Sequence, residues 1–154
     1  MVHLRQVILD KIREQLQPVA AQYLGIVTPM RSTAVPEEDL PSFIVLYTSD
    51  QTTPDGVVYD DVNRQELTRL NHRLTVNVVI HFKGRKDPSA EFDLLTAAVE
   101  SALPPSDLGG LVIDMILSGT DHFIDAGTAQ SLGAGRMVFD VSYRTYAGYP
   151  NRRA

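Results

Sequence analysis

The chain contains no cysteine among its 154 residues, which excludes disulfides, thiolate nucleophiles and thiolate zinc sites. It also lacks any apolar run near the roughly 20 residues that a membrane-spanning helix needs. Charged residues interrupt the first segment, MVHLRQVILDKIREQ, so we expect no secretory signal peptide. Basic residues are in the minority, and the net charge is −5. Because phosphate neutralisation supplies most nucleic-acid affinity, this charge argues against a dedicated nucleic-acid binder.

The remaining composition is that of an ordinary globular protein, with 44% hydrophobic and 21% charged residues. A chain of this length buries about 69% of its unfolded surface, which is enough for one real core. We expect a single domain over residues 1–147 and a polar, frayed C-terminal tail over 148–154. An equivalent sphere would be about 38 Å across.

Two segments have the apolar period of an amphipathic helix. The first spans Leu4 to Leu16, and Pro18 either ends it or begins another turn. The second begins after Asp87, a good N-cap residue, with Pro88 in the first turn, and it stops at Pro104. The core positions expected from the two helices are Ile8, Ile12, Phe92, Leu95 and Val99.

Three strands carry the clearest β patterns. Ser42–Ser49, SFIVLYTS, is apolar on both faces and predicts a buried central strand. From Leu70 to Phe82, apolar and polar residues alternate, which predicts a strand of about 13 residues, long enough to extend beyond its own domain. A similar alternation runs from Met137 to Tyr146. Shorter strands are possible at 23–27 and 116–125.

The other segments have turn-rich compositions. Thr28–Pro41 contains three prolines, Asp50–Arg69 contains a Pro54-Asp55-Gly56 turn, and Gly127–Gly135 contains three glycines, so all three are predicted to be loops. The order of elements favours an α+β fold, a largely antiparallel four- to five-stranded sheet with two main helices packed on one face. The other sheet face is then left for solvent or for a partner.

No catalytic, cofactor-binding or metal-binding constellation is predicted. His72 and His81 have opposite parity on one strand, so they face opposite ways. Asp121 and His122 lie near Ser118 and Ser131, but no nucleophile-elbow pattern surrounds them. The glycines of 127–135 are not followed by the Lys-Ser/Thr of a phosphate-binding loop.

The order of elements resembles a known family, the tail terminator proteins of long-tailed phages, such as the minor tail protein U of lambda-like siphophages. The resemblance covers most of the chain, with its most specific parts at 107–125 and in the final strand. It is carried by the amphipathic N-terminal helix, Leu40-Pro41 before the strand Phe43–Thr48, the long strand to Phe82, the Asp-capped helix around Glu91–Leu94, the segment Leu108–Gly119, Asp121-His122-Phe123 and the strand Met137–Tyr146. The long 50–69 segment and the tail after Tyr146 depart from the pattern.

The resemblance implies a structural protein and not an enzyme, with no cofactor. Monomers are expected to assemble as a ring of six copies that caps the finished tail tube and stops its growth. The implied partners are other copies of the chain, the major tail tube protein and the head-side connector, at the head-proximal end of the tail in the virion. DNA passes through the lumen without specific binding, in keeping with the negative net charge.

Two alternatives remain open. One is a neck or head-completion ring protein of the same particle, and the other is a small α+β enzyme or ligand-binding domain that uses Asp114, Asp121 and His122. For the ring, neighbours are expected to meet through strand edges and long loops, with 50–61 and 127–135 disordered in the free monomer. The candidate interface residues are Asp55, Tyr59, Asp60, Asp61, Arg73, Asp121, Phe123 and Leu132.

Overall fold

The computed structural model describes residues 2–31, 33–84, 87–125 and 131–154, with the backbone alone at 123–125 and 131. Its helices are α1 (Leu4–Gln22), the short 3-10 helix η1 (Glu37–Asp39) and α2 (Pro88–Ala102). Its strands are β1 (Ile26–Pro29), β2 (Ser42–Asp60), β3 (Gln65–Gly84), β4 (Asp114–Asp125), β5 (Ser131–Tyr146) and β6 (Tyr149–Arg153). Among these residues, no helix is long and apolar enough to cross a membrane.

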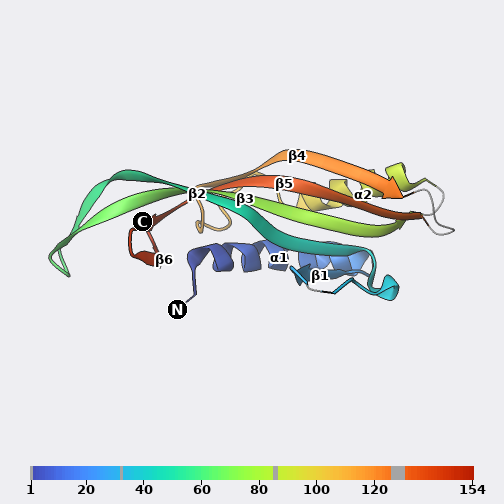
Figure 1. The fold of residues 1–154 in the computed structure, drawn as a ribbon, viewed down its shortest axis with the longest axis horizontal. Helices are drawn as coiled ribbons and strands as arrows, with labels where there is room; N and C mark the ends of the chain where they lie inside the picture. The colour runs from blue at the N-terminus through green and yellow to red at the C-terminus, as the bar shows by residue number, and fades with distance from the viewer. Residues whose placement is uncertain (1, 32, 85–86, 126–130) are drawn as a thin grey trace.

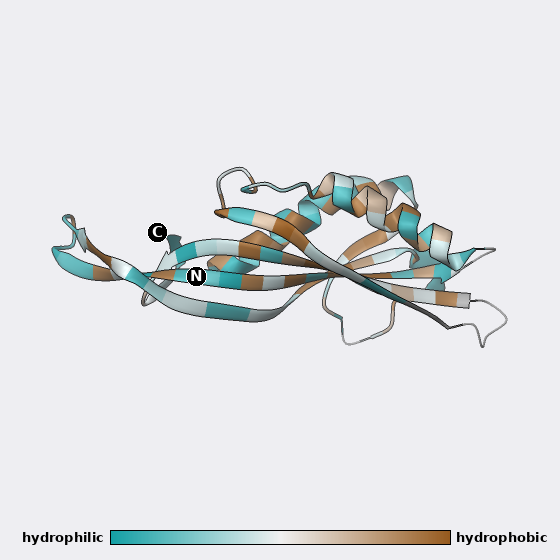
Figure 2. Ribbon diagram, turned by 90° about the horizontal axis from the view of Figure 1, so that it is seen from above, coloured by the Kyte–Doolittle hydropathy of each residue, from teal (hydrophilic) through white to brown (hydrophobic). Residues whose placement is uncertain are grey.

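The strands form one sheet in the order β1-β2-β3-β5-β4, and β6 pairs with β5 (Figure 1). The β1–β2 pair is parallel and the other pairs are antiparallel. Both α1 and α2 lie on the same side of the sheet (Figure 2). The predicted α+β class, with two helices and a mostly antiparallel sheet, is therefore confirmed, although the sheet has six strands and not four or five.

The core lies between the two helices and the sheet face that they cover. Every second side chain of β3 from Leu74 to Phe82 belongs to this core, as the alternation in the sequence predicts. The five helix residues expected in the core are all buried: Ile8, Ile12, Phe92, Leu95 and Val99. Helix α2 begins where predicted, because the Asp87 side chain accepts a hydrogen bond from the Ala90 backbone nitrogen at 3.1 Å. Helix α1 continues past Pro18 and ends at Gln22.

The prediction of a loop over Asp50–Arg69 is wrong. Strand β2 continues to Asp60, and β3 already begins at Gln65. The Pro54-Asp55-Gly56 sequence forms an irregularity inside β2, between the pairs Pro54/Leu70 and Val57/Thr68, with Gly56 at φ +84°. The real turn is at 61–64. The polar composition of this segment led to the wrong prediction of a loop. No helix covers this part of the ribbon, so a strand here can carry polar side chains on both faces.

The glycine-rich segment and the tail also differ from expectation. Of the predicted loop 127–135, residues 131–135 belong to β5, and 127–130 lie outside the described residues. Gly133 and Gly135 occupy positions where a Cβ atom would overlap the rings of Phe82 and Phe92, respectively. Their role is close packing of the sheet against aromatic side chains, not chain mobility. The C-terminal tail is not frayed, because 149–153 forms β6.

The molecule is elongated, and the expected 38 Å sphere is a poor description of it. Its accessible surface is 8761 Å², whereas the scaling law for monomers gives about 7,700 Å² for this mass. The 20 residues of β3 alone span about 63 Å at the usual rise per residue. The excess surface comes from the β2–β3 ribbon, which extends beyond the helix-covered body (Figure 1).

A matched pair of glycine substitutions tests the packing of β5. We expect Gly135→Ala to lower the free energy of unfolding by about 1–3 kcal/mol, since the methyl group would overlap the Phe92 ring and crowd the core. It would also lie 2.7 Å from the Asp121 carbonyl oxygen. Gly119→Ala is the control, because no atom lies within 4 Å of its added Cβ. We expect that change to stay within about 0.5 kcal/mol. Equal effects in chemical denaturation would contradict this account.

Candidate assembly interface

The end of the β2–β3 ribbon forms a two-stranded arm, defined here as residues 57–68. Pairing of β3 with β5 stops at Arg69, so beyond this residue β2 and β3 pair only with each other within the sheet order. Four hydrophobic residues of the arm are exposed: Val57 (61%), Val58 (38%), Tyr59 (56%) and Val62 (89%). A lone hairpin is marginally stable in water and has no layer that can bury such side chains. The arm therefore exposes apolar surface in the single chain.

The C-terminal segment braces the arm from its base at Thr68 to the residues beside its turn. Arg152 donates a hydrogen bond to the Asp60 carboxylate at 3.1 Å, and Gln65 donates one to the Tyr149 hydroxyl at 3.1 Å. The backbone nitrogen of Ala147 donates to the Thr68 carbonyl at 2.8 Å. These contacts hold the arm in place, so the residues predicted to be a separate tail belong to the folded domain.

Asp60 organises the turn at the tip of the arm. Its carboxylate accepts hydrogen bonds from the backbone nitrogens of Val62 and Asn63 and from the Asn63 side chain. The hydrogen bonds from Asn63 and Arg152 lower the pKa of Asp60 to about 2. Since the folded-state pKa lies below the ordinary 3.8, the stability that Asp60 contributes is present above that pH. It is lost as the pH falls through the range from the ordinary value toward the folded-state pKa.

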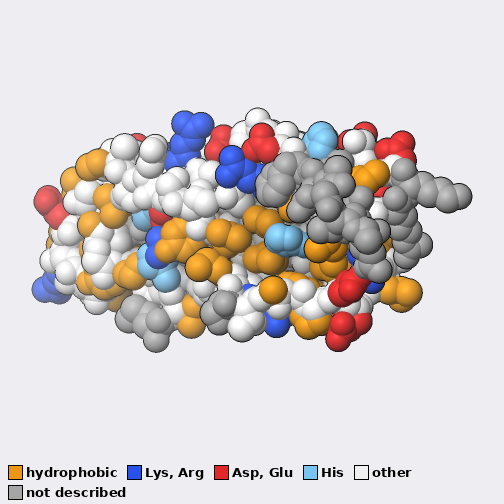
Figure 3. Space-filling view, turned by 45° about the vertical axis from the view of Figure 1, so that its right-hand side comes forward, with side chains coloured by type: hydrophobic (Ala, Val, Ile, Leu, Met, Phe, Trp, Pro, Cys, Tyr) orange, Lys and Arg blue, Asp and Glu red, His pale blue; other side chains and the backbone are white. Residues whose placement is uncertain are grey.

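The sheet face opposite the helices, called here the outer face, carries an apolar centre. Ile44, Leu46, Val79 and Val138 are half-buried there, and hydrophobic side chains gather in the middle of this face (Figure 3). Asn77 lies among them, 6% exposed, and its Oδ1 accepts no hydrogen bond from any described residue. Because buried polar atoms are almost always paired, this oxygen is expected to accept a hydrogen bond from outside the described residues.

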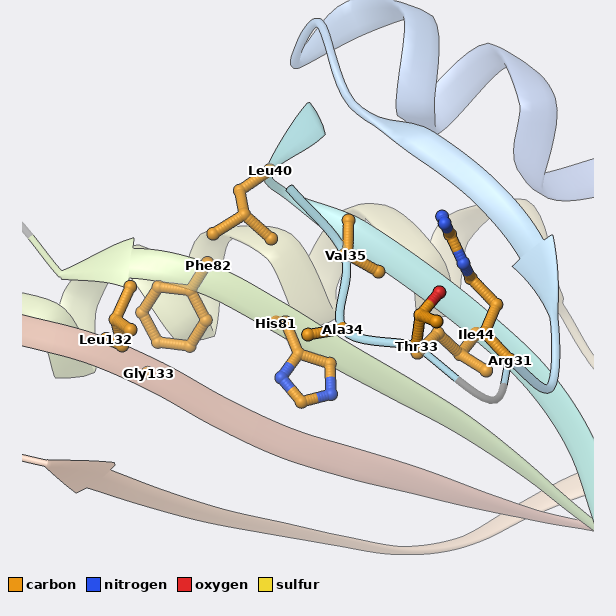
Figure 4. A pocket seen from close by; sticks show the side chains of 10 residues that line it. All are labelled: Arg31, Thr33, Ala34, Val35, Leu40, Ile44, His81, Phe82, Leu132 and Gly133. Atoms are coloured by element: carbon orange, nitrogen blue, oxygen red, sulfur yellow. The ribbon is translucent and has the colours of Figure 1, made fainter. Parts of the chain in front are cut away.

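A groove of about 470 Å³ continues the outer face at the end far from the arm. The segment between β1 and β2 forms one side of it, with Val35 and Leu40, and the sheet contributes Ile44 and Leu132 (Figure 4). His81 lies in the middle of the groove, and burial lowers its pKa below the ordinary value. Leu132 is 47% exposed. The groove is thus apolar, with a neutral imidazole at pH 7.

The eight predicted interface residues do not form one surface. Four of them, Asp55, Tyr59, Asp60 and Asp61, lie in or beside the arm, Arg73 lies midway along the outer face, and Asp121, Phe123 and Leu132 lie at the far end. Asp121 is paired with Arg136 at 2.8 Å, and Arg73 with Asp140 at 3.3 Å. Exposed pairs of this kind contribute little energy. The side chain of Phe123 is outside the described part of the structure.

Two of these residues have structural roles inside the chain. Asp55 contacts the Arg69 and Arg144 guanidinium groups at 3.1 and 3.3 Å, and Asp60 is bound by the turn and by Arg152. Tyr59 and Asp61 remain exposed and available. Sequence reasoning missed three valines of the arm, Val57, Val58 and Val62. The signal was present in the run VVYDDV, where apolar residues persist inside a polar segment.

The residues of the enzyme alternative are not gathered in a pocket. Asp114 and His122 lie eight positions apart on β4, which corresponds to about 26 Å. Asp114, Asp121 and His122 are all exposed, and the His122 ring packs at 5.1 Å from that of Phe92. Among the described residues, no three acidic, histidine or cysteine side chains are placed to hold a metal ion.

A buried polar network lies beneath the N-terminus of α1. Asp50 accepts hydrogen bonds from the Tyr143 hydroxyl at 2.6 Å and from Arg5 at 3.1 Å, and it lies 3.1 Å from His72 Nδ1. Burial and the bond to Asp50 raise the pKa of Tyr143. His72 Nε2 lies 2.8 Å from the Thr145 hydroxyl.

This Asp-His-Thr order is that of a nucleophile relay. However, Thr145 is only 1% exposed, so no substrate reaches its hydroxyl. The network therefore ties α1 to β2, β3 and β5 at the end of the helix-covered body.

The network supports a test by substitution. We expect Asp50→Ala to lower the free energy of unfolding by about 3–5 kcal/mol, because it leaves buried polar partners unpaired. Asp140→Ala removes an exposed pair with Arg73 and should cost no more than about 1 kcal/mol. Urea unfolding of both variants checks this. A small loss for Asp50→Ala would show that the network is not a structural anchor.

The brace supports a second test. We expect Arg152→Ala to raise the pKa of Asp60 from about 2 toward 3.8, since a cationic donor to the carboxylate is lost. Amide hydrogen exchange in residues 57–67 should become several-fold faster, while exchange in the helices stays unchanged. Arg153→Ala is the matched control, because Arg153 belongs to the same strand but its side chain makes no hydrogen bond or ion pair with any residue that the structure describes. NMR titration of the carboxyl groups checks the pKa, and an unshifted Asp60 would contradict the role of Arg152.

Comparisons of the chain with protein-family models and with curated proteins found no match. The functional interpretation therefore depends on the arm, the outer face and the groove.

Proposed function

We propose that this protein is the tail terminator of a long-tailed phage, a structural subunit that forms a ring on the end of the tail tube. The observation that carries the proposal is the arm, which exposes Val57, Val58, Tyr59 and Val62 beyond the body of the domain. Extended apolar surface on a small soluble protein marks a site of association. In a subunit built for assembly, such an arm is an expected feature.

Two further features support an assembly role. The outer face has an apolar centre and the unpaired Asn77 oxygen, both of which a neighbouring protein surface would cover. Its rim carries the charged pairs Arg73–Asp140 and Arg136–Asp121, giving the polar border around an apolar centre that is common in interfaces.

The ring and its partners follow from the resemblance. The proposal is a ring of six copies that caps the tube, stops addition of the major tail protein and presents its other side to the head-side connector. A net charge of −5 per chain suits a channel that must pass DNA without retaining it. No step of this role requires catalysis or a cofactor.

The decisive experiment mixes purified protein with tubes grown from the major tail protein. Negative-stain microscopy is expected to show closed rings on tube ends, and added tube subunits should no longer lengthen capped tubes. Tubes that keep growing with bare ends would contradict the proposal. Rings that bind only the isolated head-side connector would favour the neck-protein alternative.

An arm substitution makes the test specific. We expect Val62→Asp to raise the protein concentration needed for capping by about tenfold or more, because it places a charge where an apolar side chain is buried on assembly. Val7→Asp is the control, since Val7 is an exposed valine on α1, away from the arm. Both variants should keep wild-type circular dichroism. Equal capping by wild type and Val62→Asp would show that the arm takes no part.

A further inference from the structure

The arm and the groove lie at opposite ends of the same two strands. Val57 pairs with Thr68 in the arm, and Ile44 pairs with Val79 in the groove. These positions are eleven residues apart along β3, or about 36 Å. Because β2 and β3 stay paired between them, apart from two bulges, a chain cannot fold its own arm into its own groove (Figure 1). Any contact between the two must join different molecules.

The two surfaces have matching chemistry. The arm presents three valines and a tyrosine, and the groove presents the aliphatic side chains of Val35, Leu40, Ile44 and Leu132. Both sets are partly exposed in the single chain. Burying them against each other removes apolar surface from water on both sides.

Charged side chains of both signs border the two surfaces. On the arm, Asp61, Arg64 and Glu66 are exposed, and none of them has an ion-pair partner among the described residues. At the groove, Arg31 is exposed at the wall, and Glu38 is exposed in η1, just before the lining residue Leu40. Burial of apolar side chains, and not charge, therefore drives the contact.

We infer that the arm of one copy binds in the groove of the next copy of this chain. The contact is head-to-tail, so each subunit uses one arm and one groove, and repetition with a closing rotation gives a ring. This inference rests on the proposed function, since it names the contact between neighbours in the proposed ring. Its test uses the purified chain without tubes, so the arm–groove contact and the terminator function can each be refuted without refuting the other.

The absence of cysteine allows a clean cross-linking test. Val62→Cys places one thiol on the arm, Val35→Cys places one in the groove, and Val7→Cys places a control thiol on exposed α1. The single-cysteine variants are mixed in pairs under mild oxidation and analysed on non-reducing gels. Tyr59→Cys provides a second arm position if Val62→Cys does not fold.

The arm–groove pair is expected to give a disulfide-linked dimer at a yield about tenfold or more above the arm–control pair, since a bound contact raises the effective concentration of the thiols. A chain carrying both Val35→Cys and Val62→Cys should give a ladder of oligomers and no internal bond, because a disulfide cannot span the separation within one chain. The inference is overturned if Val62→Cys links mainly to itself, or if the arm–groove yield equals that of the control. Cross-linking without tube capping would support the arm–groove contact and contradict the terminator function. Tube capping without this cross-link would support the terminator function and contradict the arm–groove contact.

Discussion

The structure depends on the pairing of β3 with a long strand on each side. Over residues 69–81, β3 is paired with both β2 and β5, and its inward residues from Leu74 to Phe82 face α1 and α2. A one-residue slip in this register would move the whole apolar set to the outer face. The helices, the two packed glycines of β5 and the position of the arm are all set by this register.

The same strands serve two purposes along their length. Where helices cover them, they form the core, and where the helices stop, they continue as the arm. The transition lies at the buried network around Asp50, which ties Arg5 of α1 to Tyr143 of β5. Beyond it, the arm is held by hydrogen bonds to the C-terminal segment and not by a core. The result is an extended two-stranded ribbon with exposed apolar side chains.

This arrangement gives a physical basis for assembly without a disordered loop. The sequence analysis assigned 50–61 to a segment that would become ordered on association, but the structure forms it as a strand. A preformed arm loses less conformational entropy on binding than a loop would. In the proposed ring, premature assembly would then be prevented by the weakness of a single contact, which a template of several sites would overcome through their combined effect.

The sequence by itself determined the fold class, the start of α2 at Asp87, the core stripes of both helices and the inward parity of β3. These are local properties, because helix capping and side-chain periodicity act over a few residues. It did not determine that Pro54-Asp55-Gly56 lies inside a strand, that Gly133 and Gly135 fit under aromatic rings, or that the tail pairs as β6. It placed Tyr59 and Asp61 among the interface candidates but missed the neighbouring valines and the groove. Those features depend on contacts between residues far apart in the chain, so only the tertiary structure decided them.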